Sequence, residues 1–133
     1  MRIAKVFALV LLCCPVLVAA QTKEFPDTSG NAFLRLCSAI DKEKLTDEEI
    51  AHVTSCVGYV AGFVDGVSVY PIYAEAKAKQ KVPKLICRPD GVEHGQLISV
   101  VLKYIRNHPE DAHLPTQLLI MGAIGEAFPC SNK

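Results

Sequence analysis

Four cysteines, Cys37, Cys56, Cys87 and Cys130, limit most strongly what this chain can fold into. An even number of cysteines behind a secretory leader is typical of a protein that folds in an oxidising compartment and forms disulfides. We therefore expect two disulfide bonds. They matter because a chain of this length buries a modest core. Each disulfide would stabilise the fold by roughly 3 to 4 kcal/mol, because it lowers the conformational entropy of the unfolded chain.

The N-terminus has the pattern of a signal peptide. Arg2 and Lys5 supply positive charge, an apolar run follows over residues 6–17, and small residues precede a cleavage point after Ala20. About a dozen apolar residues are too few to cross roughly 30 Å of hydrocarbon. We predict that residues 1–20 are removed, together with Cys13 and Cys14, and that the mature chain has no membrane span.

The mature chain is expected to be one domain that folds outside the cytoplasm, in an oxidising compartment. Residues 21–29 are polar, contain a proline and are predicted to form an exposed arm, and residues 30–133 form the helical domain. Without the leader the chain has 12 basic and 14 acidic side chains. This balance does not fit a nucleic-acid binder, which needs a basic excess.

The apolar periodicity predicts an all-α fold with four principal helices. No alternation of apolar and polar residues is long enough to predict a strand. The fourth helix is apolar almost all round, and we expect it to be the most buried. The predicted helices cover residues 31–40, 46–70, 93–108 and 116–128.

The second helix carries the clearest signals. Thr46 and Glu49 form a capping box, in which each side chain bonds the backbone of the other residue. Apolar residues then recur at helical spacing and are expected to face the core, and Pro71 is expected to end the helix near Tyr70. The predicted core positions are Ile50, Val53, Val57, Val60, Val64 and Val67.

Helix order favours one of the three ways to pair four cysteines. A short connector makes the third and fourth helices antiparallel neighbours, which brings Cys87 beside Cys130. The first two helices are also joined by a short connector, which brings Cys37 toward Cys56. We therefore favour the pairs Cys37–Cys56 and Cys87–Cys130, while the other two connectivities stay open.

Three glycines repeat at four-residue spacing in the second helix: Gly58, Gly62 and Gly66. Each costs about 1 kcal/mol of helix propensity relative to alanine, so a stripe of three needs a reason. Such a stripe lets another backbone approach closely. We favour a tight crossing with another helix of the same fold, and a crossing between two copies in a homodimer is the alternative.

The sequence offers no convincing catalytic or metal site. His52 and Cys56 share a helix face, as a nucleophile pair would, but four paired cysteines leave no free thiol. The cysteines lack the close spacing of zinc ligands, and no phosphate-binding or hydrolase motif is present. We expect no enzyme, no metal and no cofactor.

Two surface segments are predicted to contact a partner. The first is the connector after Pro71, where lysines crowd beside two tyrosines, which are frequent hot-spot residues. The second is the polar loop between the third and fourth helices. The predicted contact residues are Tyr70, Tyr73, Lys77, Lys79, Lys81, His108 and His113.

Six short motifs in order resemble those of the Rap/Tai immunity proteins of bacterial type VI secretion. The match runs from Gly30 to Cys130, nearly the whole mature domain, and departs from the family at Glu93, where a neutral cap is expected. The motifs are G-N-x-x-L-x-x-C from Gly30, C-x-G-Y-x-x-G-x-x-D from Cys56, C-x-P-x-G-V from Cys87, Q-L-x-x-V-x-x-x-Y from Gln96, H-P-E from His108 and F-P-C from Phe128.

The resemblance implies a small helical periplasmic protein that binds a secreted peptidoglycan amidase effector and blocks its active-site cleft. It also implies that a homodimer is one form such a protein takes. The shared residues specify the fold, so no single inhibitory residue is carried over. Two other functions remain as alternatives: a periplasmic stress chaperone, and an orphan envelope-binding domain with the same fold.

Overall fold

A computed structural model describes residues 27–130, which form a small all-α domain without a strand in that range. The predicted fold class is confirmed. The predicted leader and most of the predicted arm lie outside the described residues. The elements are α1 (Gly30–Leu36), α2 (Asp47–Ala78), α3 (His94–Asn107), the 3-10 helix η1 (Pro109–Asp111) and α4 (Thr116–Ala127).

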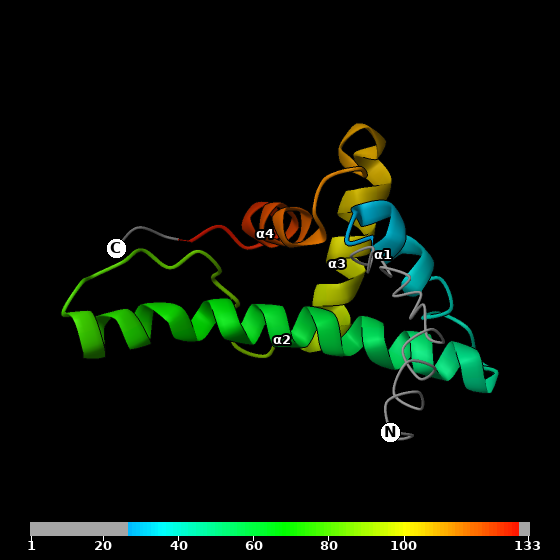
Figure 1. Ribbon diagram of the computed structural model, residues 1–133, viewed down its shortest axis with the longest axis horizontal. Helices are drawn as coiled ribbons and strands as arrows, with labels where there is room; N and C mark the ends of the chain where they lie inside the picture. Colours follow the sequence, from blue (N-terminus) through cyan, green and yellow to red (C-terminus); the bar gives the residue numbers. More distant parts are fainter. Residues whose placement is uncertain (1–26, 131–133) are drawn as a thin grey trace, which may run out of the picture.

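The long helix α2 forms one edge of the molecule, and the other helices gather on one side of it (Figure 1). The last third of α2 extends past α1 and α3. The residues after it, 79–88, run back alongside this part of α2, and we call them the returning segment (Figure 1). The core is built around α3, whose buried face packs against α4 and the middle of α2. Its largest fully buried side chains are Leu97, Ile98, Ile105, Ile120, Ile124, Val60, Val64 and Val101.

The predicted capping box opens α2. The Thr46 hydroxyl accepts a hydrogen bond from the Glu49 amide, and the Glu49 carboxylate accepts one from the Thr46 amide. A hydrogen bond from Lys42, followed by the one from Thr46, holds the pKa of Glu49 at about 2. The box therefore fixes where α2 begins and keeps a carboxylate at the positive end of the helix.

The predicted end of α2 near Tyr70 is wrong, because the helix continues through Pro71 to Ala78. A proline inside a helix removes one hydrogen bond, here the one to the carbonyl of Val67. Val67 and Pro71 both line an open groove, so water reaches this part of the helix. The alanines that follow are strong helix formers and continue the helix until Lys79, whose left-handed backbone (φ 55°) ends it.

The residues of α2 that face the core also differ in part from the predicted core positions. Cys56, Val60 and Val64 are buried, whereas Ile50 is 49% exposed and Val57 is 36% exposed. Cys56 forms a disulfide with Cys37 and therefore has to face the core. Its neighbour Val57, about 100° further round the helix, then turns outward.

The first helix is shorter than predicted. It covers seven residues, and the chain from Cys37 to Asp41 forms turns instead of the last turn of a 31–40 helix. Its start is attached to the start of α4: Thr116 donates both its amide and its hydroxyl to the carbonyl of Thr28, at 2.8 and 2.7 Å. Thr28 and Ser29, at the end of the predicted arm, are thus bonded to the domain.

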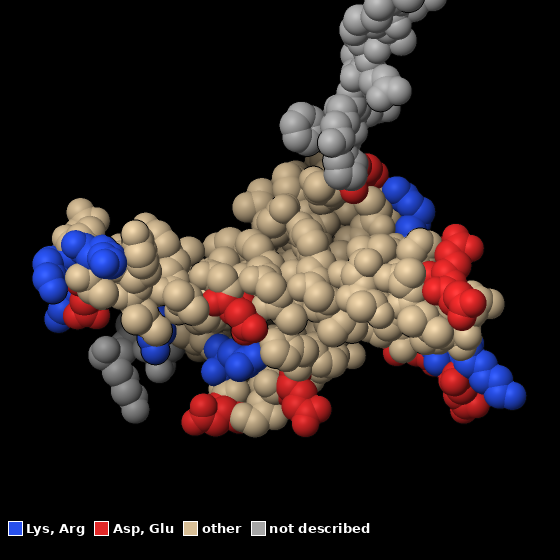
Figure 2. All heavy atoms as spheres, turned by 60° about the horizontal axis from the view of Figure 1, so that its bottom comes forward, with Lys and Arg blue, Asp and Glu red and all other residues tan. Residues whose placement is uncertain are grey.

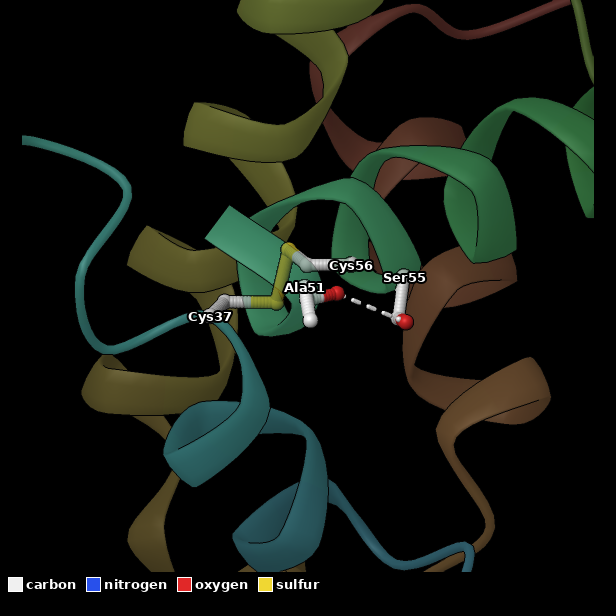
Figure 3. The surroundings of a disulfide bond; sticks show 4 residues. All are labelled: Cys37, Ala51, Ser55 and Cys56. Atoms are coloured by element: carbon white, nitrogen blue, oxygen red, sulfur yellow. Dashed lines mark hydrogen bonds between the residues drawn. A yellow bond between two sulfur atoms is a disulfide. The ribbon is translucent and has the colours of Figure 1, made fainter. Parts of the chain in front are cut away.

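Both favoured disulfides are present. Cys37 is bonded to Cys56, and Cys87 is bonded to Cys130. The first bond is fully buried and joins the end of α1 to α2 (Figure 3). The second joins the segment before α3 to the segment after α4, so it holds the returning chain beside the rest of the domain.

Candidate interaction surface

The last third of α2 exposes large apolar side chains. Ile72 is 69% exposed, Tyr73 60%, Val69 57% and Tyr70 54%, and Leu85 on the returning segment is also exposed. Tyr73 and Lys77 were predicted to lie in a connector after Tyr70, and this is wrong because they belong to α2 itself, as Tyr70 does. They are therefore carried on a helix and not on a loop.

A groove runs between this part of α2 and the returning segment. Its volume is about 570 Å³, and apolar and polar side chains line it in similar measure. We call it the distal groove. The residues that line it include Ile72, Leu85, Lys84, Arg88 and Asp65. The Asp65 carboxylate is 3.7 Å from Nε2 of His94, at the start of α3.

Charge is separated along α2. The helix begins with Asp47, Glu48 and Glu49, and its other end carries lysines. Figure 2 shows basic side chains gathered over the distal end, acidic and basic side chains together at the opposite end, and several charged side chains of both signs between the two ends. The basic side chains at the distal end are Lys77, Lys79, Lys81 and Lys84, whereas Arg88 lies nearer the start of α3, with its Nη1 3.5 Å from Nε2 of His94.

The two predicted partner segments do not meet. The distal end of α2 and the loop after α3 lie at different ends of the molecule (Figure 1). His108 follows the last residue of α3, and its Nδ1 donates to the carbonyl of Tyr104 at 2.9 Å. Its ring also packs on the Tyr104 ring, with 4.3 Å between the ring centroids. His113 is exposed, and its Nδ1 donates to the carbonyl of Glu110 at 2.8 Å.

Both histidines therefore help to shape their own loop. The distal end of α2 is the larger exposed apolar surface, and the sequence did not indicate its groove. Lys84 lies in the predicted basic segment, but Ile72, Leu85 and Arg88 were not singled out, because the groove forms only when residues 84–88 return beside α2.

A smaller cavity of about 200 Å³ lies between α1, Tyr59 and the residues that precede α1. It is lined mostly by apolar atoms. The Tyr59 hydroxyl is buried and has no hydrogen-bond partner in the described part of the chain, and burial raises the pKa of this phenol.

Cys56 is a half-cystine, as predicted from the sequence, so it cannot act with His52 as a nucleophile pair: it is bonded to Cys37 and fully buried (Figure 3). Within residues 27–130 no three histidine, cysteine or acidic side chains are grouped to hold a metal ion. By length and composition α2 could cross a membrane, a test that core helices also pass.

The predicted internal crossing at the glycine stripe is wrong. A Cβ placed on Gly58, Gly62 or Gly66 would meet no atom within 4 Å, so no other helix of the fold approaches these glycines. The core contacts of α2 lie on its other side. A crossing between two copies stays a prediction.

Comparison with known proteins gives one family. The model of the Rap1a immunity proteins matches residues 29–130. The chain belongs to the Rap1a immunity protein family. No curated protein and no solved structure matches. The Rap1a match covers all four helices and both disulfides, and it starts at Ser29, which caps α1.

Membership gives the general role of this Rap1a chain. It is an immunity protein that acts against a toxin effector, and immunity proteins of this kind generally work by binding and not by catalysis. The exposed features of a Rap1a protein are therefore best examined as binding surfaces.

Proposed function

We propose that this protein is exported to the periplasm, where it binds a peptidoglycan amidase effector of type VI secretion and blocks its active-site cleft sterically. Membership of the Rap1a family supports the immunity role. The two disulfides support an oxidising compartment, and the predicted leader supports export. Steric inhibition fits a chain whose paired cysteines offer no reactive thiol.

The distal groove and its basic rim are the proposed effector-binding surface. The observation that carries this assignment is the combination of exposed apolar side chains with a row of lysines at one projecting end of the molecule. A projecting end can enter a cleft more easily than a flat face can. Its chemistry fits an effector segment with an apolar side chain for Ile72 and Leu85 and acidic groups for Lys84 and Arg88.

The test uses the mature oxidised protein and the amidase encoded beside it. Calorimetry measures the dissociation constant, and peptidoglycan digestion measures inhibition. Ile72→Asp and Lys84→Glu should each raise Kd at least tenfold, because the first places an unpaired charge in the contact and the second reverses an attraction. Lys103→Glu is the matched control, since Lys103 is an exposed lysine on α3, away from the distal groove.

Three results are decisive. Tight inhibition that both variants weaken and the control leaves unchanged supports the proposal. Tight inhibition that neither variant changes would show that the contact lies on another surface, such as the loop with His108 and His113. If the protein binds no amidase and instead suppresses aggregation of unfolded periplasmic clients, the chaperone alternative replaces the immunity role.

A further inference from the structure

One side of the last third of α2 carries exposed apolar side chains that do not line the distal groove. Val69, Tyr70 and Tyr73 are each more than half exposed, and Lys77 lies beside them. At about 100° per residue these side chains fall within about 100° of arc. The residues of α2 that line the groove are centred on the opposite side of the helix. We call the side formed by Val69, Tyr70, Tyr73 and Lys77 the tyrosine face.

The exposure of α2 is unusual for so apolar a helix. Core helices of the same length and composition bury most of their apolar stretch, whereas in α2 the buried share of that stretch is 17%. Cys56, Val60 and Val64 nevertheless pack in the core, and Cys56 is bonded to Cys37. The helix is therefore held in the domain, and its exposed apolar side chains are available for contact with an external surface.

Lysines surround the tyrosine face at the projecting end of the molecule. Residues 69–84 carry four lysines and one acidic residue, whereas the mature chain as a whole has a small acidic excess. Within residues 27–130, Lys77, Lys79 and Lys81 form no ion pair. Figure 2 shows basic side chains gathered over this end. An anionic surface would attract this end of the molecule first and so orient the whole domain.

We propose that the tyrosine face and the lysines around it bind the surface of a bilayer that contains anionic phospholipids. Tyrosine rings favour the boundary between headgroups and acyl chains, because the ring is apolar and its hydroxyl is polar. Lysine stems lie along apolar groups while their ammonium groups reach the phosphates. The end of α2 rests in the plane of the interface and does not span the membrane.

The arrangement of the lysines favours lipid over an acidic protein. Lys77 is in the last turn of α2, Lys79 ends the helix with a left-handed backbone, and Lys81 lies further along the returning segment. These three residues therefore do not share one helix face. A folded partner holds its carboxylates at fixed positions and would have to match this uneven spacing. The phosphates of a fluid bilayer move laterally, so each ammonium group meets one where it lies.

Membrane binding and effector binding use different sides of α2. The distal groove offers Ile72, Leu85, Lys84 and Arg88 to the effector, whereas the tyrosine face is turned away from the groove. The groove therefore stays open while the protein rests on the membrane. A failed amidase assay leaves this proposal unaffected, and a failure to bind vesicles leaves the amidase proposal unaffected.

Co-sedimentation of the mature oxidised protein with vesicles tests the proposal. Vesicles of equal parts phosphatidylglycerol and phosphatidylcholine should bind the protein at low salt, and pure phosphatidylcholine should bind it at least about tenfold more weakly. Salt at about 1 M should release the protein, because the Debye length falls to about 3 Å.

Lysine variants test which charges carry the contact. Replacing Lys77, Lys79 or Lys81 by glutamine should weaken vesicle binding about fivefold each, and replacing all three should weaken it about a hundredfold. Lys103→Gln is the matched control, because Lys103 is an exposed lysine on α3, away from the tyrosine face. It should leave vesicle binding unchanged.

A tryptophan reporter tests which side of the molecule touches lipid. The chain has no tryptophan, so Tyr73→Trp places a single fluorophore in the tyrosine face. Its emission should shift to the blue when anionic vesicles are added, and brominated lipid should quench it. Leu118→Trp is the matched control: Leu118 is also exposed, but it lies in the first turn of α4, which is bonded to the residues before α1.

The proposal is overturned if the protein binds no anionic vesicles at low salt. It is also overturned if vesicles leave the emission of Tyr73→Trp unshifted, or if Lys103→Gln weakens binding as much as the three lysine variants do. If those three variants weaken amidase binding and leave vesicle binding unchanged, the tyrosine face belongs to a protein contact and the proposal is wrong. Salt-sensitive binding that the three variants weaken, with a blue shift at residue 73 and none at residue 118, supports it.

Discussion

Replacing Gly30 by alanine adds one methyl group at a tightly packed place in the fold. A Cβ on Gly30 would lie 2.4 Å from Cδ1 of Leu119, 3.1 Å from the carbonyl oxygen of Ala112 and 3.3 Å from Cγ2 of Ile105. The Leu119 side chain is buried and the Ala112 oxygen is backbone, so neither can move away freely. Overpacking of this kind costs about 1 to 3 kcal/mol.

Part of that cost is offset, because alanine is a better helix former than glycine by up to about 1 kcal/mol. We expect Gly30→Ala to lower the free energy of unfolding by about 1 to 2 kcal/mol, which corresponds to a fall in Tm of roughly 5 to 10 °C. Urea unfolding followed by far-UV circular dichroism measures the first quantity, with thiol titration to confirm that both disulfides have formed.

Gly125→Ala is the matched control. The same methyl group meets no atom there, so the helix-propensity gain stands alone and stability should stay level or rise. The reasoning is refuted if Gly30→Ala is as stable as the unchanged protein, or if Gly125→Ala is destabilised to the same extent. The first result would mean that α1 and α4 do not approach each other as closely as described, and the second that the loss at Gly30 is not due to packing.

Three further predictions concern stability. Replacing both Cys87 and Cys130 by alanine should lower the free energy of unfolding by about 4 kcal/mol, because their bond closes a separation of 43 residues; unchanged urea unfolding would contradict this. The pKa of Glu49 is about 2 in the folded protein and about 4.5 in an unfolded chain, so the unfolded chain takes up the proton first as pH falls, and stability is lost between about pH 4.5 and 2. Glu49→Gln should flatten the Tm profile in that window, and a profile as steep as before would exclude this cause. Thr116→Val should cost about 1 kcal/mol, since its hydroxyl donates to the Thr28 carbonyl, and a variant as stable as the parent in urea would show that this bond contributes nothing.

Local signals in the sequence predicted the parts of the fold that depend on neighbouring residues. Thr46 and Glu49 are three residues apart, and the side chain of each accepts a hydrogen bond from the backbone of the other. The start of α2 therefore followed from their identity. The disulfide pairs followed from helix order and short connectors. These features need no knowledge of how the helices are oriented about their own axes.

The errors arose where tertiary surroundings decide the outcome. Pro71 normally ends a helix, but here its lost hydrogen bond is next to an open groove and the cost is tolerated. Val60 and Val64 are buried as predicted, but Ile50 and Val57 were assigned to the core by spacing alone, whereas the bond of Cys56 to Cys37 turns them outward. The distal groove depends on residues about twenty positions apart, which no local pattern brings together.

The attachment of α1 to α4 has a consequence for biosynthesis. Gly30 donates its amide to the carbonyl of Leu114, and Thr116 donates to Thr28, so the first helix is held by residues made more than eighty positions later. A seven-residue helix is too short to persist alone in water. The nascent chain therefore cannot complete its N-terminal region until translation has nearly finished, and a product truncated before α4 would leave Cys37 on an unformed segment, open to mispairing.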